Sequence, residues 1–211
     1  MGSKCIGIDI GGTTVKIGIF TTEGQLLEKW EVPTRKENNG NQILPDVAAS
    51  IEKKLQKMGI DKADVVGAGM GVPGPVLPDG SVEVCVNLGW KNANPQKELS
   101  GLLGGMLVRS GNDANVAALG EMWQGGGKGY RDIVMVTLGT GVGGGVIIDE
   151  KIIAGRHGLA GEIGHIHVRD EETEYCNCGG RGCLEQVASA TGIAREARRA
   201  LAADETPSAM R

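Results

Sequence analysis

Four potential metal ligands stand close together in the last quarter of the sequence. His165 is followed by Cys176, Cys178 and Cys183 in the pattern His-x10-Cys-x-Cys-x4-Cys. One imidazole and three thiolates form a recognised tetrahedral zinc set. The glycine-rich filler before Cys183 suits a tight turn around a metal, because glycine reaches backbone angles that other residues avoid. The spacing favours zinc over its alternatives, which are three surface thiols or a disulfide.

Two carboxylates flank this cluster. Glu162 stands three residues before the histidine, and Glu185 stands two residues after the last cysteine. Carboxylates and an imidazole that converge on one spot suit a polyol, since each sugar hydroxyl both donates and accepts a hydrogen bond. One ring nitrogen of His165 can bind zinc while the other faces a ligand. The alternative is that each glutamate is solvated or only holds the loop together.

Two glycine turns carry threonine hydroxyls between apolar runs. They are Asp9-Ile10-Gly11-Gly12-Thr13-Thr14 and Leu138-Gly139-Thr140-Gly141-Val142-Gly143-Gly144. Backbone N–H groups in such turns can form a nest for an anion, Asp9 could hold Mg²⁺, and Lys16 could reach a phosphate. Neither turn is a P-loop, because the G-x4-G-K-[ST] pattern is absent. A plain hairpin is the alternative for each turn taken alone.

A third candidate is the pair Asn112-Asp113, which lies where an expected strand gives way to an expected helix. An ordinary helix N-cap would use the same residue types. A carboxylate at the C-terminal end of a strand could instead face a cleft and accept a proton from a hydroxyl during phosphoryl transfer. Spacing alone leaves both interpretations open.

Hydrophobic patterning predicts the elements that must position these residues. Strands are expected at 4–10, 15–20, 25–32, 63–72, 81–86, 106–109, 132–138, 142–148 and 151–154. Helices are expected at 41–58, from 94–95 onward, from 112–113 to about 124, and at 184–203. The order βββαβα recurs in part, with the two glycine turns at matching places. We therefore expect two related lobes with a cleft between them, at residues 1–110 and 111–211, with the second lobe incomplete.

Composition narrows the classes of partner. The chain has 211 residues, a net charge of −4 and a pI near 5.5, so neither nucleic acid nor an acidic membrane is an expected partner. No apolar run reaches the length of a membrane span, and no signal-peptide core precedes the first strand. Three of the five cysteines cluster with a histidine, which is typical of cytoplasmic metal chemistry rather than of a secreted disulfide framework.

Taken together, the motifs resemble the ROK family (repressors, uncharacterised reading frames and sugar kinases), and its bacterial glucokinase branch in particular. The match extends from residue 4 to about 200. It includes both glycine turns, Gly71-Val72-Pro73-Gly74, Asn112-Asp113, Gly161-Glu162-Ile163-Gly164-His165 and the cysteine motif that ends in Leu184-Glu185. The cysteine motif followed by glutamate is highly specific. The first glycine turn is shared with the wider actin, hexokinase and chaperone ATPase superfamily.

The resemblance implies an α/β, actin-like (ribonuclease H-like) ATPase fold and the ATP-dependent phosphorylation of glucose at its 6-hydroxyl, with Mg²⁺ and a structural Zn²⁺. It makes Asp113 the catalytic base. It implies sugar ligands at Asn112, Glu162, His165, Glu185 and Asn87, and zinc ligands at His165, Cys176, Cys178 and Cys183. It implies nucleotide contacts from Asp9, Gly11, Gly12, Thr13, Lys16, Gly139, Thr140 and Gly141.

Family kinases are longer than this chain. The resemblance therefore implies that much of the adenine pocket and a C-terminal helix returning to the first lobe lie outside it, and that the full-length protein is a homodimer. A kinase for another hexose or an N-acetylhexosamine is one alternative, and a catalytically inactive fragment that binds sugar and zinc is another. A sugar-responsive repressor is disfavoured, because the first glycine turn begins at Gly11 and leaves no room for a preceding helix-turn-helix.

Overall fold

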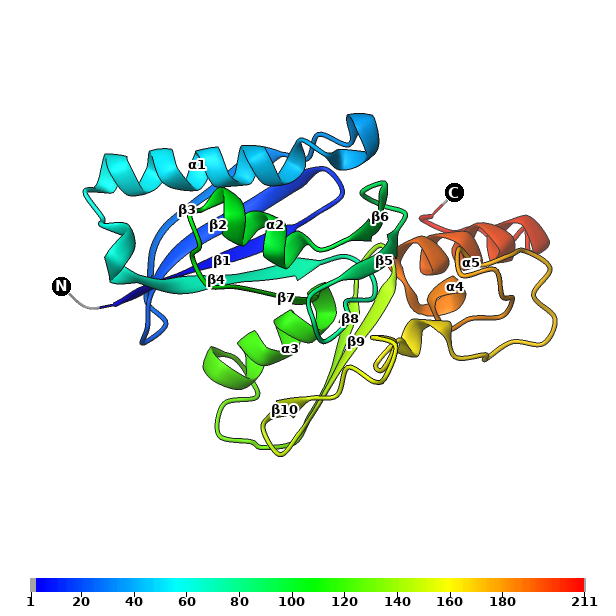
Figure 1. The fold of residues 1–211 in the computed structure, drawn as a ribbon. Coiled ribbons are helices and arrows are strands. Elements are labelled where there is room, and N and C mark those ends of the chain that lie inside the picture. The colour runs from blue at the N-terminus through cyan, green and yellow to red at the C-terminus, as the bar shows by residue number, and fades with distance from the viewer. Residues whose placement is uncertain (1–2, 211) are drawn as a thin grey trace.

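The computed structural model describes residues 3–210. Two main β-sheets organise the chain (Figure 1). The first is a mixed sheet of five strands in the order β3-β2-β1-β4-β7, and the second is a three-stranded sheet in the order β10-β9-β8. The strands of the first sheet are β1 (Lys4–Ile10), β2 (Thr14–Thr21), β3 (Leu26–Pro33), β4 (Val65–Val72) and β7 (Val108–Asn112).

The first sheet begins as the expected antiparallel meander. Strands β1, β2 and β3 pair antiparallel; β4 then pairs in parallel with β1, and β7 pairs in parallel with β4. Helices α1 (Ile43–Met58) and α2 (Pro95–Leu102) cover one face of this sheet, while α3 (Asp113–Gln124) lies on the other side (Figure 1). Parallel strands need such crossover helices, since a hairpin cannot join them.

One apolar core joins the first sheet to α1 and α2. Alternate residues of β1 and β2 point into it, as the period of two in a strand requires. Helix α1 presents its buried residues at helical spacing, which is the pattern that predicted it. The fully buried aliphatic side chains of this core include Ile6, Ile10, Val15, Ile17, Ile19, Ile43, Ile51 and Met70.

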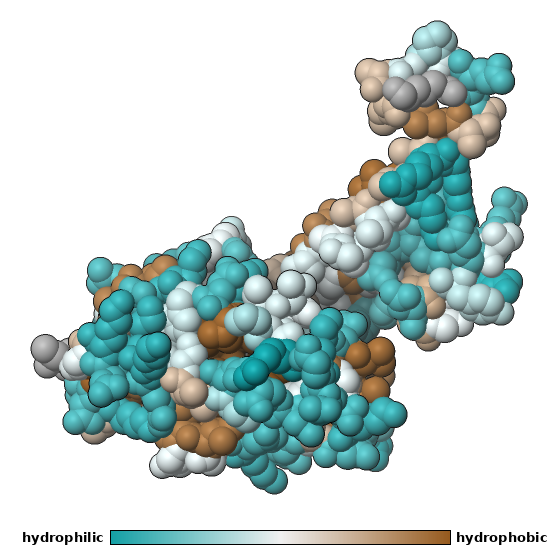
Figure 2. All heavy atoms as spheres, turned by 90° about the horizontal axis from the view of Figure 1, so that it is seen from above, coloured by the Kyte–Doolittle hydropathy of each residue, from teal (hydrophilic) through white to brown (hydrophobic). Residues whose placement is uncertain are grey.

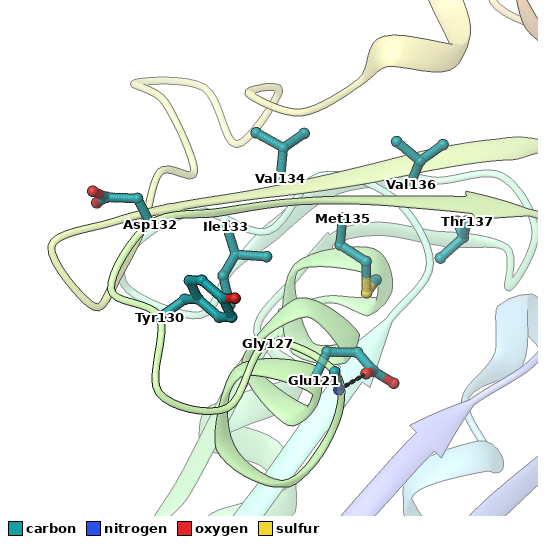
Figure 3. Close-up of a pocket in the computed structure, with 10 residues that line it drawn as sticks. Glu121, Gly127, Tyr130, Asp132, Ile133, Val134, Met135, Val136 and Thr137 are labelled. Atoms are coloured by element: carbon teal, nitrogen blue, oxygen red, sulfur yellow. Dashed lines mark hydrogen bonds between the residues drawn. The ribbon is translucent and has the colours of Figure 1, made fainter.

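The second sheet contains β8 (Ile133–Leu138), β9 (Val142–Ile148) and β10 (Lys151–Ile152). On β8, the side chains alternate between α3 and the opposite side, where Val134 and Val136 are exposed (Figure 3). A hollow between β8 and the end of α3 is lined by Glu121, Tyr130 and residues of β8, and contains none of the predicted site residues.

Shorter elements complete the described part of the chain. Strands β5 (Val82–Cys85) and β6 (Trp90–Ala93) form a hairpin. The 3-10 turns are η1 (Glu37–Gly40), η2 (Lys62–Asp64) and η3 (Ile163–His165), and the chain ends with α4 (Glu185–Ala188) and α5 (Ala190–Ala203). The part carrying α5 projects from the larger mass of the molecule (Figure 2). None of the helices among residues 3–210 combines the length and the apolar character needed to cross a membrane.

Two sequence expectations need correction. Strand β6 was not expected, because its sequence is half polar and Asn92 adopts a left-handed backbone that breaks the alternation. The single helix expected at 184–203 is two helices that meet at Ser189, whose backbone is extended. The Ser189 side chain accepts a hydrogen bond from the N–H of Gly192, so this serine is a helix N-cap.

Candidate functional site

The structure brings the four predicted zinc ligands together. The ligand atoms of His165, Cys176, Cys178 and Cys183 all lie within 4.8 Å of one another, and none of the cysteines is in a disulfide. The Nδ1 atom of His165 is 3.7 Å from the sulfur of Cys176, and the sulfurs of Cys178 and Cys183 are 3.6 Å apart. Tetrahedral zinc with ordinary bond lengths separates its ligand atoms by about 3.6–3.8 Å. The donor set and its spacing therefore fit zinc.

The thiols of this cluster differ in acidity. Burial raises the pKa of the Cys183 thiol to about 12, and burial also raises the pKa of Cys176. A hydrogen bond from the N–H of Gly180 lowers the pKa of Cys178. Zinc binds thiolates, so metal binding here must release protons from the two buried sulfurs.

The loop that carries these ligands, residues 165–183, which we call the zinc loop, is held to α5 by a buried carboxylate. Glu172 is inaccessible to solvent and receives hydrogen bonds from Arg195 and Arg199 of α5. These guanidinium groups, together with the N–H of Glu174, lower the pKa of Glu172 to about 2. The side-chain amide of Gln186 adds a bridge from the N–H of Cys183 to the carbonyl of Glu174. The loop and α5 therefore form one packed unit.

The predicted sugar ligands Glu162, His165 and Glu185 lie beside this cluster. The Nε2 atom of His165 is 4.0 Å from the carboxylate of Glu162, so one ring nitrogen faces the metal set and the other faces a carboxylate. Burial raises the pKa of Glu162, and the charges of Asp113 and Glu185 raise it further against the opposing effect of His165. The charges of Asp113 and Glu185 are thus close enough to act on Glu162.

Asp113 opens α3 at the point where β7 ends. The residue is exposed, yet desolvation by the surrounding chain raises the pKa of its carboxyl group, with a further contribution from the charge of Asp9. The N–H of Ala114 donates to it at 2.8 Å. The preceding Asn112 is the N-cap of α3 and accepts from the N–H of Asn115, while its amide donates to the carbonyl of Gly74.

Close packing of β9 on α3 sets the position of Asp113. A Cβ atom on Gly145 would lie 2.6 Å from the Cβ of Ala118 and 3.0 Å from the carbonyl oxygen of Ala114. Any larger residue there would push away the helix that begins at Asp113. The glycine run after the second turn is therefore required by packing as well as by the turn.

The first glycine turn joins β1 to β2. Asp9 and Lys16 are paired across these strands, and their charged groups are 4.0 Å apart and mostly exposed. Thr34, which follows β3, holds the turn from behind: its hydroxyl donates to the carbonyl of Gly11 at 2.7 Å, and its N–H donates to the carbonyl of Thr13 at 2.9 Å. Sequence patterning gave no sign of this role, because a threonine after a strand is unremarkable.

The second turn joins β8 to β9 and contacts Glu185, one of the predicted sugar ligands. A carboxylate oxygen of Glu185 accepts the N–H of Val142 at 3.0 Å. A Cβ atom on Gly141 would lie 2.2 Å from that oxygen, so only glycine leaves room for the contact. Asn87 is exposed in the turn between β5 and β6, where its N–H faces the thiol of Cys85.

Two sheets, each with a glycine turn between antiparallel strands, and a carboxylate where a parallel strand gives way to a helix are features of the α/β, actin-like class. The chain belongs to the ROK family, whose profile matches residues 5–209. It is 47% identical to a glucokinase from Halalkalibacterium halodurans over 191 residues, which cover 90% of this chain and 58% of that protein. The chain thus spans less than two thirds of the length of the curated relatives it matches.

Solved structures agree with this assignment. The crystal structure of a ROK family glucokinase from Streptomyces griseus, in complex with glucose and AMPPNP, superposes with a TM-score of 0.78 at 35% identity, covering 96% of this chain and 62% of that one. A ROK family transcriptional regulator, a homologue of the E. coli MLC protein, superposes with a TM-score of 0.86 at 26% identity, covering 100% of this chain and 52% of that one. The actin-like fold expected from the sequence is therefore confirmed.

Proposed function

We propose that this chain is the greater part of an ATP-dependent hexose kinase that phosphorylates glucose at its 6-hydroxyl. The observation that carries the proposal is the convergence of Asp113, Glu162 and Glu185 beside the two glycine turns, with Asp113 at the carboxyl end of a parallel strand. Ligands of α/β sheets bind at that end of the strands. The similarity to glucokinases, one of which was crystallised with glucose and AMPPNP, supports the choice of substrates.

In this proposal, Asp113 accepts the proton of the sugar hydroxyl as that oxygen bonds to the γ-phosphorus of ATP and ADP leaves. Phosphoryl transfer of this kind depends on positioning and charge stabilisation more than on strong basicity. The sugar is held by hydrogen bonds with Asn112, Glu162, His165, Glu185 and Asn87, in which the two carboxylates accept from sugar hydroxyls.

The turn around Gly11, Gly12 and Thr13 and the turn around Gly139, Thr140 and Gly141 supply backbone donors for the phosphates. Lys16 adds a positive charge, and Asp9 would hold the Mg²⁺ that neutralises the phosphates. Zinc on His165 and the three cysteines would fix the ring of His165 for the sugar. We place the boundary between the two lobes at residues 110 and 111, and we keep a homodimer as the expected state of the whole protein.

The proposal is tested by measuring ADP formation with Mg-ATP and a panel of sugars: glucose, fructose, N-acetylmannosamine and N-acetylgalactosamine. Turnover that requires glucose supports it, and turnover with another sugar alone would move the proposal to that hexose. Glucose binding without turnover, followed through tryptophan fluorescence, would identify the chain as a sugar-binding part of the kinase. Neither binding nor turnover with any sugar would overturn the proposal.

A further inference from the structure

The first residues of α5 donate hydrogen bonds to two carbonyl groups of the second glycine turn. The N–H of Ala190 donates to the carbonyl of Gly139 at 2.8 Å. The hydroxyl of Thr191 donates to the carbonyl of Thr140, also at 2.8 Å. Two successive peptide groups of the turn are therefore fastened to two successive residues of the helix.

The single proton on each hydroxyl fixes the direction of the hydrogen bonds that join Ser189, Thr191 and Thr140. Thr191 has one hydroxyl proton, and it is used on the carbonyl of Thr140. The 3.0 Å contact between the hydroxyls of Ser189 and Thr191 must then be a donation from Ser189. Ser189 in turn accepts the N–H of Gly192. The chain of donors runs in one direction, from the first turn of α5 to the glycine turn.

Fastening these carbonyls also orients two N–H groups. In a trans peptide the C=O and the next N–H point in opposite directions, and the described residues contain no cis peptide. Since the carbonyls of Gly139 and Thr140 point to α5, the N–H groups of Thr140 and Gly141 point away from it. Within residues 3–210, neither N–H has a protein acceptor. They are aligned donors that are available to a ligand.

We propose that Thr191 is a positioning residue: by holding the carbonyl of Thr140, it aims the N–H groups of Thr140 and Gly141 at a phosphate of the nucleotide. The inference rests on the proposed function, because it takes this turn to be a phosphate-binding turn. Thr191 itself touches no substrate. Its effect passes through the peptide planes of the turn.

The segment of residues 185–191 also contains Glu185, one of the predicted sugar ligands. Glu185 lies six residues before Thr191, and its carboxylate holds the N–H of Val142, the residue after the turn. The turn is thus fixed on both sides by residues 185–191. Through this segment, the position of the phosphate donors is tied to the carboxylate that we assign to the sugar.

The test replaces Thr191 with valine, which keeps the shape of the side chain and removes its hydroxyl. Two quantities are measured: amide hydrogen exchange of residues 138–142, and binding of pyrophosphate with Mg²⁺ by calorimetry, which offers phosphates without an adenine. A lost hydrogen bond of ordinary strength predicts pyrophosphate binding about fivefold weaker and exchange in the turn about fivefold faster. Thr191→Ser should restore both. The exposed Thr173→Val in the zinc loop is the matched control, with both values unchanged.

Unchanged exchange and binding in Thr191→Val would overturn the inference. Faster exchange throughout α5 and the zinc loop would also overturn it, because the residue would then be a general structural contact. A wild-type chain that does not bind pyrophosphate would overturn the phosphate role of the turn. Pyrophosphate binding without glucose-dependent ADP formation would count against the proposed function and leave the role of Thr191 standing.

Discussion

The two glycine turns of this protein are held by the same kind of hydrogen bonding, but the donors come from different parts of the chain. In each turn, one backbone N–H and one threonine hydroxyl fasten two carbonyl groups. Thr34 supplies both donors for the first turn, whereas Ala190 and Thr191 supply them for the second. The hydroxyl bond of the first turn spans 23 residues, and that of the second spans 51.

This difference in distance along the chain has a physical consequence. Thr34 follows directly from β3 in the meander that also forms the first turn, so the first turn and its anchor fold together. The anchor of the second turn lies beyond the whole zinc loop, which is packed on α5 through Glu172 and its arginines. The second turn should therefore depend on the metal, and the first should not.

The strongest test of this comparison removes a zinc ligand. Cys178→Ser should lose the metal and unfold the loop between His165 and Glu185, since zinc binding contributes on the order of 10 kcal/mol to the folding of small zinc sites. Hydrogen exchange should become much faster at residues 138–142 and through the loop, and should stay unchanged at residues 9–14. Zinc content is measured in the same samples.

Cys5→Ser is the matched control, because Cys5 lies in β1, away from the metal ligands. It should keep its zinc and its exchange pattern. Equal loosening of both turns in Cys178→Ser would show that the comparison is wrong. Reduced wild-type protein that contains no zinc would remove the ligand assignment itself.

The next largest effect is expected at Asp113, which opens the helix between the two sheets. Asp113→Asn should lower turnover by about 10²- to 10⁴-fold, because the amide cannot accept the hydroxyl proton, and should leave glucose affinity nearly unchanged. Steady-state ADP formation and a glucose titration measure the two quantities. Asp170→Asn, whose carboxylate is 98% exposed, is the control.

The raised pKa of Asp113 also predicts the pH dependence. A base must be ionised, so activity should fall as the pH decreases through this pKa, which lies above its usual 3.8. A carboxyl group with a raised folded pKa stabilises the fold only while it is protonated, and that stability is lost as the pH rises. Asp113→Asn should therefore raise the melting temperature at neutral pH. Turnover within twofold of wild type would exclude Asp113 as the base.

A smaller loss is expected at the link between the zinc loop and α5. Glu172→Gln should lower the free energy of unfolding by on the order of 2 kcal/mol, because the buried side chain loses its charge-assisted hydrogen bonds from Arg195 and Arg199. Chemical denaturation at neutral pH measures it. The second turn should exchange faster in this variant, and the first turn should not.

The stability contributed by Glu172 depends on pH with the opposite sign to that of Asp113. The pKa of Glu172 is lowered from 4.5 to about 2, so its stabilisation is complete above pH 4.5 and is lost as the pH falls toward 2. The difference between wild type and Glu172→Gln should shrink over that range. Glu171→Gln, its exposed neighbour, should match wild type throughout. A constant difference at every pH would contradict the assigned ion pair.

The smallest effect is expected at the anchor of the first turn. Thr34→Val should cost about 1 kcal/mol, the usual net contribution of one hydrogen bond, and should speed exchange at residues 9–14 alone. Thr34→Ser should restore it. Faster exchange at residues 138–142 in Thr34→Val would show that the two anchors are not independent.

Local patterning predicted most of the elements and the metal ligands. The helical spacing of apolar residues in α1, the alternation in β1 and β2, and the short-range cysteine spacing each reflect interactions between residues close in sequence. Strand β6 escaped prediction because its half-polar sequence gains its place from pairing with β5. Ser189 carries an ordinary cap signal, but a strong helical pattern on both sides of it concealed the break.

By itself, the sequence determined the family to which the chain belongs, and it predicted the residues for zinc, sugar hydroxyls and phosphates. Only the tertiary structure decided which groups hold those residues in place. Thr34 and Thr191 have no distinctive neighbours, and their partners lie 23 and 51 residues away. A hydrogen bond between such distant groups depends on where whole strands and helices pack, and so only the folded structure reveals it.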